Sequence, residues 1–278
     1  MKVLSMASRV TALPVLGLVS GAVNRRPTAG ELAGYLACQR LAERGVREVA
    51  ALMCEGWTEQ HAAGLLDTWL KDHGVKSFFH KSFVWFGDRT RFRGVRGYGG
   101  YMPSRRVLRP GEVFILDVAP ILHGHIADVG YTTALGSNAE LARAQAFLAE
   151  LRAELPGLFA GGNAGADVWQ AMRARIGAAG YEPIHEKYPF GVLGHRVHRV
   201  KAEEPRAHLY NFGWQSYWEF LSRGLFGQLL NDSFTGDLLG LWAIEPHVGA
   251  AEFGAKFEEI LVVDEDGARW LESERPGA

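Results

Sequence analysis

Asp117 and Asp128 lie eleven positions apart in the segment ILDVAPILHGHIADVGYTT, residues 115–133, where most neighbours favour β-strands. A buried carboxylate is costly unless a hydrogen bond or an opposite charge compensates it. In a hairpin centred on Leu122 and His123 the two aspartates would face each other, with Cβ atoms roughly 5 Å apart. Two carboxylates that close either share a proton or bracket a cation, and a pair of divalent ions is one arrangement that fits.

Three later segments each place an ionisable residue among apolar strand formers. They offer His195 in GVLGHRV, Glu245 in LLGLWAIEPHV, and Glu258 or Glu259 in KFEEILVV. Taken singly, a strand histidine is usually a hydrogen-bonded core residue and a strand glutamate usually faces solvent. Together with the aspartates, they favour a carboxylate-rich metal centre with one imidazole, a donor set that suits Mn, Fe(II), Co or Zn.

The elements that must position these residues follow an order of helices, strands, helices and strands. Thr28 and Glu31 have capping-box spacing, which predicts a first helix that Gly56 stops, and Thr58 begins a second helix that Gly74 ends. Two more helices are predicted over residues 138–159 and 165–180. Strand patterns occupy 77–134, 191–200, 238–248 and 256–271. The pattern predicts one α+β domain with two similar halves.

The composition is that of a soluble globular protein. Apolar residues make up 47% and charged residues 22%, and the net charge of −1 gives no field that would draw the chain to nucleic acid or to a membrane. Two cysteines form neither a zinc motif nor a disulfide framework, which favours a reducing compartment. Residues 1–23 contain an apolar run of about fourteen residues, too short to span a bilayer. We expect a packed N-terminal extension and a cytoplasmic protein, with export as the alternative.

The five candidate ligands resemble, in order and setting, the pita-bread metallopeptidases: methionine aminopeptidase, aminopeptidase P, prolidase and creatinase. That family carries two aspartates eleven residues apart, a histidine in a GHG-type segment, a glutamate in IEP, and a last glutamate nine residues before a glycine. Counting back from Gly267 selects Glu258 over Glu259. The resemblance covers roughly residues 34–273. It implies a curved antiparallel sheet with flanking helices over residues 34–278, after an extension at 1–33.

The resemblance also implies an activity. Asp117, Asp128, His195, Glu245 and Glu258 would hold one or two divalent ions, which lower the pKa of a bound water and polarise a carbonyl. The expected reaction is hydrolysis of an amide near a free amino terminus in a small peptide, as in Xaa-Pro aminopeptidases and dipeptidases. Glu245 would double as the general base.

Two histidines that the family uses outside its ligand set have no counterpart at the usual positions. The region 90–108 before Asp117 contains no histidine, and Ala202 or Glu203 stands where the second is expected. His198 and His247 are candidate catalytic substitutes. A non-peptidase metalloenzyme therefore stays open as an alternative, either a C–N hydrolase or an iron-dependent enzyme of a small molecule. So does a catalytically inactive binding homologue.

An aromatic-rich insertion is predicted at about residues 207–240, between the histidine and glutamate ligands. Its helical spacing favours core packing of an inserted helix. The alternatives are a wall of an apolar pocket or a homodimer contact. The candidate pocket residues are His80, Trp85, Phe86, Trp214 and Trp218.

Overall fold

The computed structural model describes residues 26–200, 208–224 and 227–272, so most of the predicted extension at 1–33 lies outside the described residues. The helices are α3 (Ala29–Leu52), α4 (Glu59–Asp72), α5 (Ala139–Ala160), α6 (Gly165–Ala178) and α7 (Trp214–Ser222). The strands are β1 (Ser77–Phe86), β2 (Val113–Leu122), β3 (His125–Ile126), β4 (Val129–Ala134), β5 (Glu182–Pro183), β6 (Gly194–Arg196), β7 (His208–Leu209), β8 (Phe212–Gly213), β9 (Leu229–Leu230), β10 (Gly240–Ile244), β11 (His247–Gly249), β12 (Gly254–Lys256), β13 (Glu259–Asp264) and β14 (Gly267–Trp270). The predicted α+β class is confirmed.

Helix α3 begins where its sequence predicts. The Thr28 side chain accepts from the backbone N–H of Glu31, and the Glu31 carboxylate accepts from the backbone N–H of Thr28 at 2.8 Å. The helix ends at Leu52, four residues before Gly56, so the predicted stop is too late. Thr58 caps α4 as predicted, because its hydroxyl accepts from the backbone N–H of His61.

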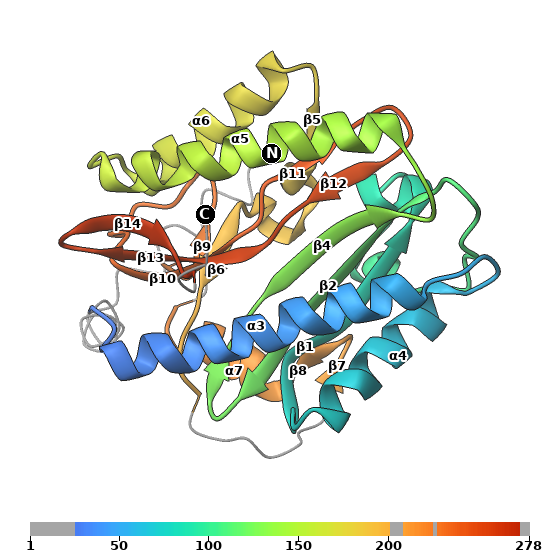
Figure 1. Cartoon of the computed structure of the whole chain (residues 1–278). Helices are drawn as coiled ribbons and strands as arrows, with labels where there is room; N and C mark the ends of the chain where they lie inside the picture. Colours follow the sequence, from blue (N-terminus) through green and yellow to red (C-terminus); the bar gives the residue numbers. More distant parts are fainter. Residues whose placement is uncertain (1–25, 201–207, 225–226, 273–278) are drawn as a thin grey trace, which may run out of the picture.

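The strands form antiparallel sheets that helices cover from two sides. One sheet has the order β3-β2-β1-β8-β7, with β4 paired to β2, and a second has the order β14-β13-β10-β6-β9. Helices α3 and α4 pack on the first sheet, and α5 packs against β12, β13 and β14. In Figure 1, α3 and α4 cross the lower half of the molecule in front of β1 and β2, and α5 and α6 run along the top, above β11–β14. An isolated bridge between Gly130 and Glu258 joins the two halves at the level of the candidate ligands.

The hairpin that carries both aspartates turns one residue later than predicted. Its two-residue turn is His123–Gly124, with φ of 51° and 77°, the left-handed pair that a tight hairpin turn requires. Asp117 therefore pairs with Gly130 and not with Asp128. The pairing of Val118 with Val129 leaves Asp128 beside Ala119, on the face that Asp117 also shares. The two aspartates are diagonal neighbours, so their side chains still converge.

Four clusters of buried apolar residues hold the sheets in place among the described residues, and two of them are large. One lies between α3, α4, β1 and β2 and includes Val46, Leu66 and Phe114; the other lies between α5, α6, β10 and β13 and includes Leu151 and Trp242. Among the described residues, no helix is both long and apolar enough to cross a membrane.

The aromatic segment after residue 207 does not fold as a core helix. It forms the β7–β8 hairpin and the short helix α7, where Trp214 and Trp218 are 54% and 71% exposed. The prediction of core packing is therefore wrong for these two tryptophans. Phe212, Tyr217 and Phe220 of the same segment line a cavity. The boundaries at residue 33 and at 207–240 stay predictions.

Candidate metal centre

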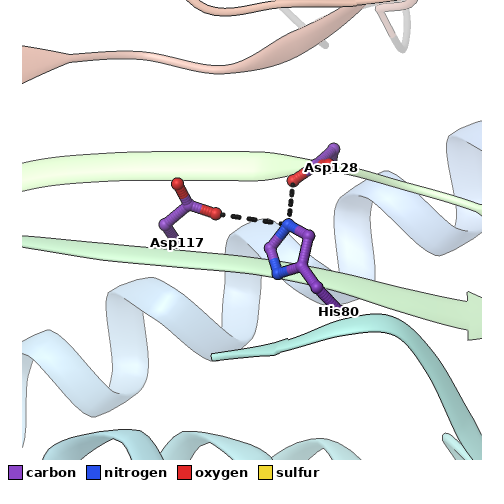
Figure 2. Close-up of side chains that lie close together, drawn as sticks. All are labelled: His80, Asp117 and Asp128. Carbon is purple, nitrogen blue, oxygen red and sulfur yellow. Dashed lines mark hydrogen bonds and ion pairs between the residues drawn. The ribbon is translucent and has the colours of Figure 1, made fainter. Parts of the chain in front are cut away.

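Asp128 lies between two histidines at the bottom of a cavity. Its Oδ1 is 3.1 Å from His80 Nε2, and its Oδ2 is 3.1 Å from His195 Nε2. The same His80 nitrogen is 3.6 Å from Asp117 Oδ1. Figure 2 shows both aspartates converging on this one ring nitrogen. The geometry therefore adds His80, expected only as a pocket residue, to the polar cluster.

Strand pairing explains why these side chains meet. His80 on β1 pairs with Ala119 on β2. Asp128 lies beside the same alanine on the opposite side of β2. In both histidines the outer ring nitrogen, Nδ1, contacts a backbone carbonyl: Lys81 O at 3.0 Å from His80 and Arg196 O at 3.1 Å from His195. Such a contact orients the ring and leaves Nε2 to face the carboxylates, as in histidines that bind metals.

The other three predicted ligands gather around a lysine that sequence analysis did not single out. Lys256 Nζ lies 2.6 Å from Asp117 Oδ2, 2.8 Å from Glu245 Oε2 and 2.8 Å from Glu258 Oε2. The Lys256 side chain is fully buried. Glu245 follows β10 directly, and Glu258 lies between β12 and β13 at the bridge to Gly130. All five predicted residues are thus brought together from four separate strand regions.

The charges of this cluster shift the pKa values of its members. Burial opposes a charge on His80, but Asp128 and Asp117 outweigh it and raise the pKa of His80 to about 9. Burial also opposes the Asp128 carboxylate, yet its two imidazole neighbours lower the pKa of Asp128. Burial raises the pKa of Glu245, and burial with Asp128 and Glu245 nearby raises that of Glu258. Four buried acids in one place create a strong demand for positive charge.

The donor atoms suit a divalent ion. Three sets have ligand atoms that all lie within 4.8 Å of one another: His80, Asp117 and Asp128; Asp128, His195 and Glu258; and Asp117, Glu245 and Glu258. Asp117 Oδ1 is buried and has no hydrogen-bond partner among the described residues. Carboxylate oxygens with imidazole nitrogens are the donors that Mn, Fe, Co and Zn accept. These residues could therefore hold a metal ion.

A cavity of about 540 Å³ opens above the cluster. Its polar end is formed by His80, Asp117, Asp128, His195, Glu245 and Glu258, and the rest of its wall is mainly aromatic. The aromatic lining residues are Phe79, Phe83, Trp85, Tyr98, Tyr101, Tyr188, Phe190, Tyr210, Phe212, Tyr217 and Phe220. The shape and lining are those of a small-molecule site.

Of the predicted pocket residues, the structure places His80 and Trp85 in this wall, but three others lie elsewhere. Phe86 is fully buried against Phe114, because it alternates to the core face of β1. Trp214 and Trp218 point to solvent on α7.

Neither predicted catalytic histidine lines the cavity. His198 Nε2 contacts Gln228 Oε1 at 2.5 Å, beyond the end of β6. His247 Nδ1 lies 3.0 Å from the Tyr188 hydroxyl, which itself is 3.3 Å from Lys256 Nζ. His247 therefore contacts the cluster through Tyr188. Lys256 and Tyr188 were missed, although Lys256 is two residues before Glu258 and shares its strand face.

Comparisons with known proteins agree with this geometry. The sequence matches the model of Metallopeptidase family M24 over residues 33–265. No curated protein sequence shows significant similarity to the chain. The fold is similar to that of an X-Pro aminopeptidase from Thermotoga maritima, with a TM-score of 0.67 and 18% identity over 95% of this chain and 65% of that one.

Two further solved structures show the same fold. A prolidase from Pyrococcus furiosus aligns with a TM-score of 0.64 and 16% identity over 93% of this chain and 68% of that one. A methionine aminopeptidase from Rickettsia prowazekii aligns with a TM-score of 0.59 and 15% identity over 90% of this chain and 99% of that one. The chain thus spans about 65% of the X-Pro aminopeptidase and nearly all of the methionine aminopeptidase. The expected pita-bread fold is confirmed, and the chain belongs to Metallopeptidase family M24.

Proposed function

We propose that this protein is a metal-dependent hydrolase that cleaves an amide bond in a small, largely apolar substrate. The observation that carries the proposal is the convergence of Asp117, Asp128, His195, Glu245 and Glu258 at the polar end of an aromatic cavity. The family match supports the reaction class, because this is a family of metallopeptidases. A bound divalent ion would supply an acidified water and a Lewis acid for the carbonyl.

Glu245 is the residue that we assign to proton transfer. Its carboxylate lines the cavity, and burial raises its pKa, which suits a group that must take up and return a proton near neutral pH. The two neighbouring imidazoles lower the pKa of Asp128, so its side chain remains a charged carboxylate that can bind a metal ion. Phe79 stacks on the His195 ring at 5.6 Å between centroids and Phe220 meets its edge at 5.9 Å, so the ring has little freedom to turn.

The substrate side of the cavity favours apolar groups. None of the described residues that line it is a lysine or an arginine. The carboxylate of a free dipeptide would therefore meet no lysine or arginine on this wall, whereas a proline ring or another apolar group would contact aromatic rings. Our first candidate is an Xaa-Pro bond in a peptide that is either amidated at its C-terminus or longer than a dipeptide. The apolar wall, together with the absence of histidine over residues 90–108, supports a second candidate: C–N hydrolysis of a non-peptide amide.

A substrate panel separates the two candidates. The protein is reconstituted in turn with Mn²⁺, Fe²⁺, Co²⁺ and Zn²⁺ and incubated with Xaa-Pro peptides, Met-containing peptides, their C-terminal amides and apolar non-peptide amides. We expect release of the N-terminal residue from the amidated Xaa-Pro peptides, and Glu245→Gln should abolish it. Turnover of the non-peptide amides alone would replace the first candidate by the second. No turnover with any of these metals would contradict both and favour an inactive binding protein.

Three sequence predictions that concern the whole protein remain proposals. They are a cytoplasmic location, a homodimeric state and a metal chosen from Mn, Fe, Co and Zn.

A further inference from the structure

Lys256 reaches the centre of the cluster because the surrounding backbone is shaped to admit it. Thr132 on β4 fixes the Lys256 backbone, since its hydroxyl donates to Lys256 O at 2.7 Å and accepts from Lys256 N at 2.9 Å. The lysine stem then passes over Gly130, where a Cβ atom would lie only 2.4 Å from Lys256 Cε. Any side chain at residue 130 would block this path. The two hydrogen bonds between Thr132 and the Lys256 backbone, together with the missing Cβ of Gly130, direct the Lys256 ammonium toward the carboxylates.

The Lys256 ammonium is surrounded by oxygen atoms. Its three N–H donors match the three carboxylates of Asp117, Glu245 and Glu258 at 2.6–2.8 Å. The Tyr188 hydroxyl lies at 3.3 Å, and the ammonium also lies 5.4 Å from the centroid of the Tyr188 ring. The side chain has no exposed surface, so the positive charge faces these groups and not solvent.

The same three carboxylates form one of the sets of atoms that could hold a metal. A divalent ion bound by these oxygens would need them at about 2.0–2.6 Å from its centre, the space that Nζ now fills. The remaining donors lie on the other side of the cluster, in two sets that both include Asp128. One set adds His80 and Asp117, and the other adds His195 and Glu258.

We propose that the Lys256 ammonium takes the place of a second metal ion, so that the centre binds a single divalent ion through Asp128, His195 and Glu258. Lys256 is then a positioning residue: it holds Asp117, Glu245 and Glu258 in place as a cation that the chain itself carries. The inference rests on the metal centre of the proposed function and goes beyond it by fixing the number of ions.

Manganese binding provides the test. Metal-free protein is titrated with Mn²⁺ by calorimetry, and the loaded protein is examined by electron paramagnetic resonance. We expect one Mn²⁺ per chain and the six-line spectrum of an isolated ion. Lys256→Met should bind two Mn²⁺ and show the spectrum of an exchange-coupled pair. Lys187→Met is the matched control, because Lys187 pairs with Glu182 at 2.8 Å outside the cluster, and it should bind one.

Each result has a defined meaning. Two coupled ions in the wild-type protein would overturn the inference and leave the proposed function intact. One ion in both wild-type protein and Lys256→Met would also overturn it, because removal of the ammonium would have opened no site. No binding to the wild-type protein would contradict the metal centre itself. If Lys256→Met does not fold, Lys256→Gln is titrated instead, and the wild-type stoichiometry alone still decides between one ion and two.

Discussion

The two sides of the acidic cluster balance their negative charge in different ways. On the imidazole side, defined by Asp128, His80 and His195, each carboxylate oxygen faces a ring nitrogen at 3.1 Å. On the ammonium side, defined by Asp117, Glu245, Glu258 and Lys256, three carboxylates share one lysine. An imidazole can lose its proton and present a lone pair to a metal, whereas an ammonium group has only donors. One side therefore suits an exchangeable cation, and the other holds a cation attached to the chain.

Removing the attached cation should have the largest effect on stability. Lys256→Met leaves three buried carboxylates without their ammonium, and breaking a buried ion pair from one side typically costs about 3–5 kcal/mol. We expect that loss in the free energy of unfolding, measured by urea denaturation at pH 8 with EDTA. Added Mn²⁺ should restore most of it. A loss below about 1 kcal/mol would show that the carboxylates do not depend on Lys256.

Removing the central acid of the imidazole side should instead weaken metal binding. Asp128→Asn takes away the charge that both imidazoles face, and changes of groups that merely support metal ligands already cost about 10–100-fold in affinity. We expect a loss of at least about 100-fold in Mn²⁺ affinity by calorimetry. Asp264→Asn is the control, because Asp264 is an equally buried aspartate that pairs with Arg269 outside the cluster. Equal affinities in the two variants would contradict the assignment.

A buried histidine away from the acids, His185, should respond to pH in the opposite way to His80. Asp128 and Asp117 raise the pKa of His80 to about 9, but burial, helped by Arg173, lowers the pKa of His185 to about 4. Neither ring nitrogen of His185 has a hydrogen-bond partner among the described residues. Below pH 6.5 the unfolded chain takes up a proton at His185 that the folded chain refuses until about pH 4. Its contribution to stability is therefore lost as the pH falls through this window.

The expected slope is about 1.4 kcal/mol per pH unit from this residue. Urea denaturation between pH 7 and pH 4.5 should show a shallower fall for His185→Gln than for the wild-type protein. His73→Gln, at the exposed end of α4, is the control and should follow the wild-type curve. Parallel curves for all three proteins would show that His185 is protonated equally in both states.

The aromatic wall should affect substrate binding and leave the metal in place. Phe212 lies 5.4 Å from the His80 ring and 6.0 Å from Phe83, between centroids, inside the cavity. Phe212→Ala should raise KM about tenfold for an apolar substrate, the size expected for one lost contact in such a pocket. Trp218→Ala is the control, because Trp218 is 71% exposed and does not line the cavity. Loss of bound Mn²⁺ in Phe212→Ala would mean that the wall also supports the cluster.

Much of the centre could be predicted from residue types, but its exact geometry could not. Apolar strand segments pointed to Asp117, Asp128, His195 and Glu245, because buried charges stand out against strand formers. The strand pattern left Glu258 and Glu259 open, and the family resemblance selected Glu258. The turn was predicted one residue too early, which shifted the predicted partner of Asp117 by two residues, from Gly130 to Asp128. The backbone conformation at His123 and Gly124 decides which two residues make the turn. His80 was too far from Asp117 in sequence to be joined to it without the β1–β2 pairing.

Lys256 and the exposed tryptophans mark the limits of pattern reasoning. In sequence, Lys256 resembles a lysine of any strand at the edge of a sheet. Its side chain points toward the carboxylates because Gly130, in another strand, leaves room for it. The helical spacing of Trp214 and Trp218 indicated a buried stripe. Whether an amphipathic stripe is covered depends on what packs against it, which local spacing does not specify.

X-ray diffraction from crystals soaked in Mn²⁺, with anomalous data, would show directly whether the side chains of the cluster share a metal ion. We expect one anomalous peak per chain, within about 2.0–2.5 Å of Asp128 and His195, with Lys256 Nζ still between Asp117 and Glu245. A peak elsewhere, or none between these side chains, would contradict the claim that they share a metal ion.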